Sequence, residues 1–183
     1  MTPREQTALL STVSAARQRT YLLALTTGLR RGELAALAAE PGRLDLAAGV
    51  VRLRPEETKN REETCLPVPE PVLRLLRGAG LSLDIPTMKD WHRDLLNAGI
   101  EYETSEGVAD FHALRVTFAT NLARAGVPLV VAQKLMRHSD PKLTSNVYSR
   151  FGTAEVREAL SRVVPAIIPA TVPDTKEEEV VLV

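Results

Sequence analysis

The spacing of the apolar residues changes twice along this chain, and these changes constrain the fold more than any other feature of the sequence. Over residues 3–39 apolar residues recur as they do on helix faces, and we expect these leucines to be buried: Leu22, Leu23, Leu25, Leu29, Leu34 and Leu37. Between residues 44 and 68, three short runs alternate in part between apolar and polar residues, which is typical of β-strands. Helical spacing returns at residue 70. We therefore predict an α+β fold, mainly α with a small three-stranded antiparallel β-sheet.

Capping signals and turns indicate where the elements begin and end. Thr2 followed by Pro3 predicts a helix start, and we expect this first helix to continue to about residue 16. We expect further helices at residues 17–25, from 31 onward, and at 70–76, 87–98, 111–125, 128–136, 142–148 and 154–164. We expect strands at residues 44–46, 50–54 and 64–68, with Lys59 at the tip of the second hairpin. An acidic segment is expected to form a solvated loop and contains Glu101, Glu103, Glu106 and Asp110.

The length of the chain allows one hydrophobic core. With 183 residues, of which 44% are hydrophobic, we expect a single domain over residues 1–165. Residues 166–183 contain two prolines, a charge run and a short apolar end, so we expect an extended or disordered tail.

Cysteine usage and hydropathy indicate the compartment. The single cysteine, Cys65, excludes an internal disulfide, and we interpret it as a small apolar strand residue and not as a nucleophile or metal ligand. No apolar run approaches the roughly 20 residues that span a bilayer, and the N-terminus lacks the apolar stretch of a signal peptide. We expect a cytoplasmic protein with no membrane partner.

The charge balance bears on nucleic-acid binding. The 23 basic and 23 acidic residues cancel, whereas domains that bind DNA usually carry a basic excess. Part of the acidic excess lies in residues 171–183, which hold one lysine and four acids, so residues 1–170 have 22 basic and 19 acidic residues and a net charge of +3. The balance therefore opposes DNA binding only weakly.

Several side chains suit chemistry on a phosphodiester. Such chemistry needs a nucleophile, cations for the non-bridging oxygens and a proton for the departing oxygen. Arg30 and Arg115 offer planar forks that match phosphate, and His112 lies three residues before Arg115, on the same face of the predicted helix. Lys59 is a candidate general acid. A turn after His138 would bring it near Tyr148, a candidate nucleophile that needs help from cations or a base because its pKa is ordinarily about 10.

Each of these residues also has an ordinary interpretation. Arg30 alone can be a surface residue paired with Glu33, Lys59 a solvated turn lysine and Tyr148 an amphipathic residue at a helix end. His138 can belong to a capping turn, and the His112–Arg115 pair can be a chance spacing. A zinc site has little support because the histidines lack ligand spacing and Cys65 is distant in sequence. Only the joint occurrence of these residues, in this order, favours a catalytic set.

That order resembles the catalytic domain of the tyrosine recombinases, the phage integrase family. The resemblance is carried by three motifs, a lysine and a tyrosine: Thr27-Gly-Leu-Arg30-Arg-Gly-Glu33, Lys59 in a hairpin, His112-Ala-Leu-Arg115, Leu135-Met-Arg-His138-Ser and Tyr148. It implies that Tyr148 attacks a phosphate of double-stranded DNA and forms a 3′-phosphotyrosyl bond. It also implies site-specific recombination or integration, as in mobile elements, without metal or other cofactor, since the covalent link conserves the bond energy.

The resemblance further assigns supporting parts and partners. Glu33 is implied to buttress Arg30, and the enzyme is implied to act as a homo-oligomer, a tetramer on synapsed DNA, with a monomer allowed without DNA. Family members usually carry an N-terminal core-binding domain, which we expect this chain to lack. Two positions depart from the family pattern: Arg137 stands where glycine is common and Val116 where histidine is frequent. We expect altered packing or DNA contact there.

Two alternatives to a recombinase remain. The first is a truncated, non-catalytic DNA-binding or assembly module with the same fold. The second is a topoisomerase-like activity, because the same phosphotyrosyl step without a second duplex relaxes supercoils.

Overall fold

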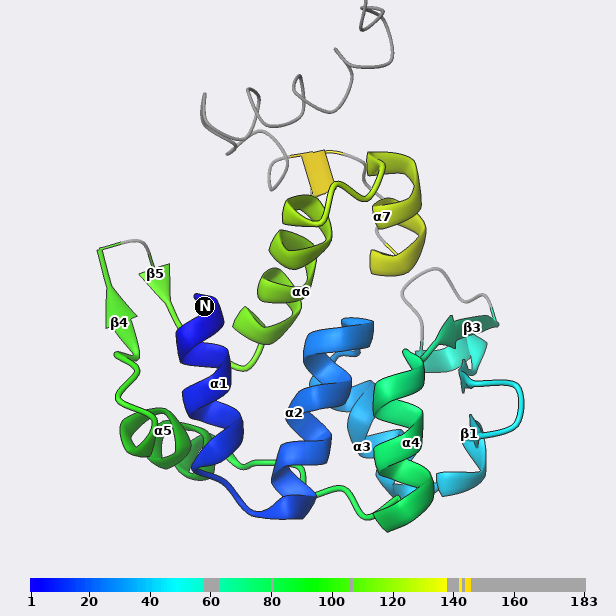
Figure 1. Ribbon diagram of the computed structural model, residues 1–183, viewed down its shortest axis with the longest axis horizontal. Helices are drawn as coiled ribbons and strands as arrows, with labels where there is room; N and C mark the ends of the chain where they lie inside the picture. The colour runs from blue at the N-terminus through cyan, green and yellow to red at the C-terminus, as the bar shows by residue number, and fades with distance from the viewer. Residues whose placement is uncertain (58–62, 80, 106, 138–141, 143, 146–183) are drawn as a thin grey trace, which may run out of the picture. The chain divides into compact units, whose positions relative to one another are not determined.

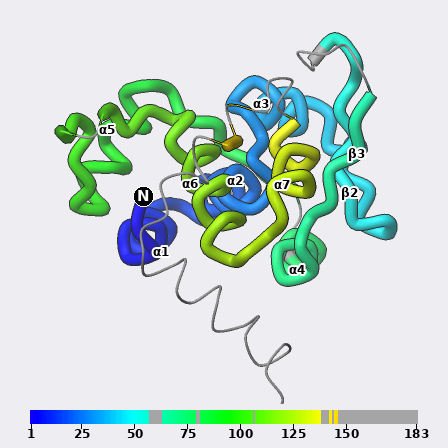
Figure 2. Tube along the Cα trace, turned by 90° about the horizontal axis from the view of Figure 1, so that it is seen from above, coloured from blue at the N-terminus to red at the C-terminus, as the bar shows by residue number. Residues whose placement is uncertain are grey.

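Helices make up most of this computed structural model, which describes residues 1–57, 63–79, 81–105, 107–137, 142, 144 and 145. In this part of the chain α2 lies at the centre, and it packs against α1, α3, α4 and α6 (Figure 1). Seen from above, the three-stranded sheet lies on one side of α2 and α5 on the other (Figure 2). The described residues contain no helix that is both long and apolar enough to cross a membrane.

The N-terminal layer contains α1 (Pro3–Ser11), α2 (Ala15–Thr27) and α3 (Arg31–Ala39). Thr2 caps α1 in a capping box with Glu5, as the Thr2-Pro3 signal predicts. The predicted continuation of this helix to residue 16 is wrong. The side chain of Ser14 accepts a hydrogen bond from the backbone N–H of Arg17 at 3.3 Å, so Ser14 begins a new helix.

The predicted three-stranded antiparallel sheet is confirmed. It consists of β1 (Leu44–Asp45), β2 (Val50–Leu53) and β3 (Thr64–Pro67), with β2 in the middle. Val51 of β2 pairs with Leu44 on one side and Leu66 on the other, and all three side chains face the core. Two short 3₁₀ turns, Pro41–Arg43 and Pro55–Glu57, flank β1 and β2. The predicted hairpin tip with Lys59 lies outside the described residues.

Four further helices follow the sheet: α4 (Glu70–Ala79), α5 (Met88–Asn97), α6 (Ala113–Arg124) and α7 (Leu129–Met136). Their positions agree with the predicted ones, although α6 begins at Ala113 and not at Phe111. The acidic segment is not wholly a loop, because β4 (Glu103–Thr104) and β5 (Gly107–Val108) pair as an exposed hairpin. The helices expected at residues 142–148 and 154–164, and the expected tail, lie outside the described residues except for residues 142, 144 and 145.

An aromatic cluster joins three segments of the core. Tyr21 of α2, Trp91 of α5 and Phe111 before α6 are buried, and their ring centroids lie 5.4 to 6.2 Å apart in tilted or edge-on arrangements. Trp91 donates its indole N–H to the carbonyl of Ala109 at 2.8 Å, which satisfies its buried polar atom. The cluster therefore fixes the start of α6 against α2.

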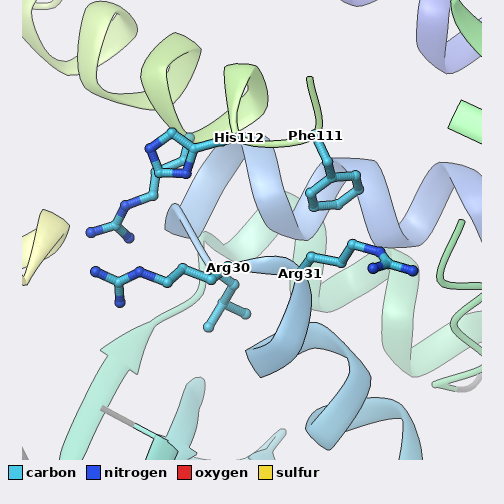
Figure 3. A pocket seen from close by; sticks show the side chains of 6 residues that line it. Arg30, Arg31, Phe111 and His112 are labelled. Atoms are coloured by element: carbon cyan, nitrogen blue, oxygen red, sulfur yellow. The ribbon is translucent and has the colours of Figure 1, made fainter. Parts of the chain in front are cut away.

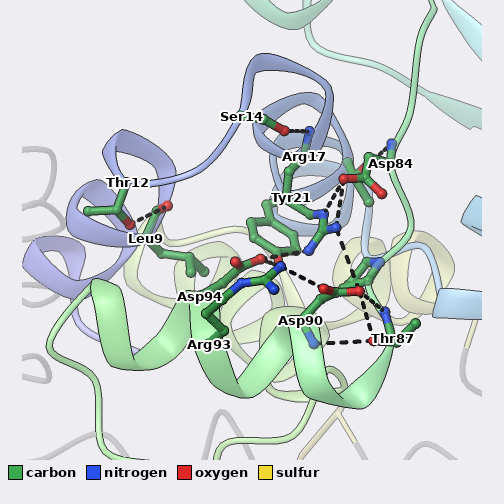
Figure 4. Close-up of polar contacts among 12 residues, drawn as sticks. Leu9, Thr12, Ser14, Arg17, Tyr21, Asp84, Thr87, Asp90, Arg93 and Asp94 are labelled. Atoms are coloured by element: carbon green, nitrogen blue, oxygen red, sulfur yellow. Dashed lines mark hydrogen bonds and ion pairs between the residues drawn. The ribbon is translucent and has the colours of Figure 1, made fainter.

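A buried ionic network connects α2 to α5 beside this cluster (Figure 4). The guanidinium of Arg17 pairs with Asp94 at 2.8 Å and with Asp84 at 2.6 Å, and Tyr21 donates its hydroxyl to Asp94 at 2.5 Å. Burial raises the pKa of Tyr21 and the hydrogen bond to Asp94 raises it further, so the phenol stays protonated and remains a donor. Each polar group in this network compensates for the desolvation of another.

Removing Asp94 leaves the buried hydroxyl of Tyr21 without its acceptor and takes one of two close carboxylate partners from Arg17. Asp94→Ala is expected to lower the free energy of unfolding by about 3 kcal/mol or more, because Arg17 and Tyr21 lose their common acceptor. The matched control is Arg93→Ala on the same helix, whose side chain is 62% exposed and pairs with Asp90 at the surface. This change should cost less than about 1 kcal/mol. Urea denaturation measures both, and equal losses would contradict a structural role for the network.

Candidate active site

A tight turn between α2 and α3 begins the candidate site. Gly28 ends α2 in the left-handed region with φ 66°, and its N–H donates to the carbonyl of Ala24 at 3.0 Å. A Cβ atom at Gly28 would lie 2.7 Å from the ring of Phe118 on α6. The glycine is therefore required twice, by its backbone conformation and by the close approach of α6.

This turn places Arg30 at the N-terminus of α3, next to a buried carboxylate. Glu33 accepts from the backbone N–H of Arg30 at 2.7 Å and from its Nη1 at 3.0 Å. The side chain of Glu33 is 3% exposed, whereas that of Arg30 is 34% exposed. Glu33 thus holds Arg30 at a single guanidinium nitrogen and leaves the rest of the group open.

Arg115 comes from the first turns of α6 and is almost fully buried. Its guanidinium donates to two backbone carbonyls, those of Gly28 and Met136, and so joins the α2–α3 turn to the end of α7. Burial, and then the positive charges of Arg30 and Arg137, lower the pKa of Arg115 to about 9. The site therefore carries an excess of positive charge that a bound anion would relieve.

His112 lies at the N-cap position of α6 and is exposed. Together with Arg30 and Arg115 it lines a pocket of about 140 Å³, whose other lining residues are Leu29, Arg31 and Phe111. Arg30 and His112 face the same side of this pocket, whereas Arg31 points the opposite way (Figure 3). Partial desolvation of the His112 ring, and then the positive charge of Arg115, lower its pKa, although Asp110 opposes this. The imidazole is therefore neutral near pH 7 and able to accept a proton.

Arg137 is a further member of the site, and sequence reasoning did not place it there. Its Nη1 and Nη2 donate to the two carboxylate oxygens of Glu33 at 2.8 and 3.0 Å, and Nη2 also reaches the carbonyl of Gly28 at 3.3 Å. Arg137 ends α7 with φ 50°, a conformation that costs a residue other than glycine about 1 to 2 kcal/mol. The sequence did hold one signal for this conformation. Arg137 directly follows a predicted helix, at a position where the resembled family commonly has glycine, which accepts a positive φ.

The charge state of Glu33 follows from these contacts. Burial alone would raise the pKa of Glu33, but the hydrogen bonds and charge of Arg137, with those of Arg30, outweigh burial and hold the pKa below its ordinary value. Glu33 is therefore ionised in the folded protein. Three guanidinium groups, from Arg30, Arg115 and Arg137, surround this one carboxylate.

The predicted site residues are thus recovered in part. The structure brings together Arg30, Glu33, His112 and Arg115, while Lys59, His138 and Tyr148 lie outside the described residues. Three further residues do not line the pocket. Val116 is exposed on α6, Cys65 is exposed on β3, and His92 packs against Tyr102. Among the described residues, no group of three or more histidine, cysteine or acidic side chains is arranged to hold a metal ion.

Comparison with known proteins agrees with this geometry. The profile of the phage integrase family matches residues 87–154. Tyrosine recombinase XerD of Yersinia pestis is 30% identical over 152 residues, which cover 72% of this chain and 48% of XerD, so the chain spans about half the length of this relative. The chain is therefore similar to tyrosine recombinases of the phage integrase family over part of its length. The segment that matches the family profile includes His112 and Arg115, and it lies after the turn that holds Arg30 in the sequence.

Solved structures show the same fold at lower identity. The catalytic domain of bacteriophage HP1 integrase superposes with a TM-score of 0.65 at 20% identity, over 88% of this chain and 92% of that domain. The integrase of transposon Tn1549, solved in complex with transposon right end DNA, superposes with a TM-score of 0.65 at 22% identity, over 90% of this chain and 65% of that one. The predicted α+β fold of a tyrosine recombinase catalytic domain is therefore confirmed.

The turn at Gly28 can be tested by two glycine substitutions. Gly28→Ala is expected to lower the free energy of unfolding by at least about 2 kcal/mol, because its Cβ would be strained at positive φ and would clash with Phe118. Gly32→Ala is the control, since a Cβ at Gly32 meets nothing within 4 Å and alanine favours a helix by up to about 1 kcal/mol. Chemical denaturation of both variants measures the difference, and a neutral Gly28→Ala would refute the close approach.

Proposed function

We propose that this chain cleaves and rejoins double-stranded DNA at specific sites, through a covalent bond between Tyr148 and a 3′ phosphate. The observation that carries the proposal is the pocket where Arg30 and Arg115 converge beside His112. Planar cations of this kind bind two oxygens of one phosphate, and a buried excess of positive charge favours a dianionic transition state over a monoanionic ground state.

The proposed reaction is an exchange of phosphoesters. The oxygen of Tyr148 attacks the phosphorus, the bond to the 5′ oxygen breaks, and that oxygen takes a proton from Lys59. Arg30, Arg115 and His138 stabilise the charge on the non-bridging oxygens. His112, neutral near pH 7, accepts the phenolic proton. A 5′ hydroxyl of a second strand then attacks the phosphotyrosine and releases the tyrosine oxygen, which is protonated again, so the phosphorus has the same number of ester bonds after each step.

The partners follow from this chemistry. The Tn1549 integrase, which shares the fold, was solved on DNA, and this supports double-stranded DNA as the substrate. Strand exchange between two duplexes uses four cleavages, so we propose a homotetramer on synapsed DNA.

Residues 1–165 would form the catalytic domain. Because its substrate would be DNA, we propose that the protein acts in the cytoplasm.

Covalent trapping tests the proposal without knowledge of the target sequence. The full chain is incubated with a pool of randomised duplexes, each carrying one nick beside the central phosphate so that the cleaved piece diffuses away. We expect a covalent protein–DNA adduct that survives denaturation, and its loss in Tyr148→Phe. Sequencing of the trapped DNA then yields the target. DNA binding without any adduct would instead support the non-catalytic module, and relaxation of supercoiled plasmid without strand exchange would support the topoisomerase-like activity.

The forked shape of the Arg30 guanidinium can be tested separately from its charge. Arg30→Lys keeps the positive charge but loses the fork, so we expect adduct formation to slow by about 100-fold or more. Arg31→Lys is the matched control, because Arg31 points away from Arg30 and donates to the carbonyl of Pro86 at 3.0 Å. Single-turnover rates at saturating DNA measure both variants. Near-parental cleavage by Arg30→Lys would refute the proposed phosphate clamp.

A further inference from the structure

Glu33 is shared by two arginines that approach it differently. Arg137, 104 positions away in sequence, contacts both carboxylate oxygens, at 2.8 and 3.0 Å. Arg30, three positions away, contacts one oxygen through Nη1 at 3.0 Å, and its Nε and Nη2 have no hydrogen-bond partner among the described residues. Arg137 is therefore the only one of the two whose guanidinium contacts both carboxylate oxygens, while Arg30 reaches the second oxygen through its backbone N–H at 2.7 Å.

Burial separates the two arginines as well. The side chain of Arg137 is 9% exposed, whereas that of Arg30 is 34% exposed. A phosphate entering the pocket can therefore meet Arg30, whereas Arg137 is not one of the lining residues and its guanidinium contacts Glu33 and the carbonyl of Gly28. This arrangement favours an indirect role for Arg137 over direct contact with DNA.

We propose that Arg137 is a positioning residue: by occupying both oxygens of Glu33, it prevents a two-point pair between Glu33 and Arg30 and keeps the fork of Arg30 available for the scissile phosphate. This inference rests on the proposed function of the pocket. Without Arg137 the carboxylate would keep, among the described residues, only the backbone N–H and the Nη1 of Arg30 as donors, and the open side of its oxygens would be available to a second nitrogen of the Arg30 fork. The chain also continues from Arg137 directly into His138, so the same ion pair anchors the backbone next to a proposed catalytic residue.

The first test reports on Glu33 itself and needs no DNA. The charged groups that face Glu33 are Arg30 at the start of α3, Arg137 at the end of α7 and Arg115 on α6. Removing Arg137 takes away the largest favourable interaction of the ionised carboxylate, so its pKa should rise. The carboxyl carbon of Glu33 is followed by NMR through a pH titration of the parent chain, Arg137→Gly and Arg137→Lys. We expect the midpoint to rise most in Arg137→Gly and less in Arg137→Lys, which keeps the charge.

The effect of pH on the stability of the variant follows from the same change in the pKa of Glu33. A carboxylate whose pKa is lowered by folding stabilises the protein above its unfolded pKa, and this contribution is lost as pH falls through the folded pKa. Arg137→Gly should therefore lose stability at a higher pH than the parent chain as the solution is acidified. Arg124→Ala is the control for removal of one positive charge. It lies at the opposite end of α6 from His112, about 18 Å along the helix, and is exposed. An unchanged Glu33 midpoint in Arg137→Gly would overturn the proposal.

The second test measures catalysis on nicked duplex trapped by the parent chain. Arg137→Gly should fold, since glycine accepts the positive φ at this position. We expect its single-turnover rate at saturating DNA to fall about 10-fold to 100-fold, with DNA affinity within about 2-fold of the parent, because misplacement of a phosphate ligand affects the transition state more than binding. Arg137→Lys should recover part of the rate, and Arg124→Ala should match the parent.

Two results of this second test would overturn the proposal. One is an unchanged rate in Arg137→Gly. The other is weaker DNA binding with an unchanged rate at saturation and a salt dependence reduced by about one phosphate contact, which would make Arg137 a direct DNA ligand. If the parent chain itself gives no adduct, the proposed function fails. The Glu33 titration still decides whether Arg137 holds that carboxylate.

Discussion

The arrangement of the candidate site depends on one buried carboxylate, that of Glu33. Its side chain is 3% exposed, and a carboxylate so deeply buried stays charged only when cations and hydrogen-bond donors surround it. Those donors come from Arg30 at the start of α3 and from Arg137 at the end of α7. Neither end can move away without leaving a charge unpaired. The interaction therefore holds together two parts of the chain whose separation in sequence would otherwise allow them to move independently.

The carbonyl of Gly28 provides a second common point, because it accepts hydrogen bonds from Arg115 and Arg137. This carbonyl is aimed by the left-handed turn that ends α2, and α2 is also the helix whose Tyr21 joins the aromatic cluster and the Arg17 network. The site is therefore attached directly to the central helix of the core. Such attachment suits a phosphate clamp, since cations held in place need no reorganisation when charge develops.

Elements whose signals are local could be predicted from the sequence. The three strands and most helices follow from apolar spacing, and the Thr2-Pro3 start follows from capping chemistry. The break at Ser14 was missed because apolar residues continue across it, and only the cap of α2 marks the boundary. The contact between Arg137 and Glu33 could not be predicted, because it joins residues 104 positions apart and depends on how α7 packs. The resemblance supplied the order of the site residues, but only the structure shows which of them compete for one carboxylate.

The same local arrangement explains why net charge is a poor guide to the function of this chain. The whole sequence has 23 basic and 23 acidic residues, yet the candidate site gathers the guanidinium groups of Arg30, Arg115 and Arg137 around the one carboxylate of Glu33. Coulomb interactions at a partly buried site are weakly screened, whereas the exposed acids of the chain are screened by salt within about 10 Å. The energy of a phosphate in the pocket would therefore depend on the nearby guanidinium groups far more than on the net charge of the chain. Affinity for the rest of a DNA duplex is a separate matter, because it depends on charges spread along the surface. A net charge of zero provides little attraction of that kind.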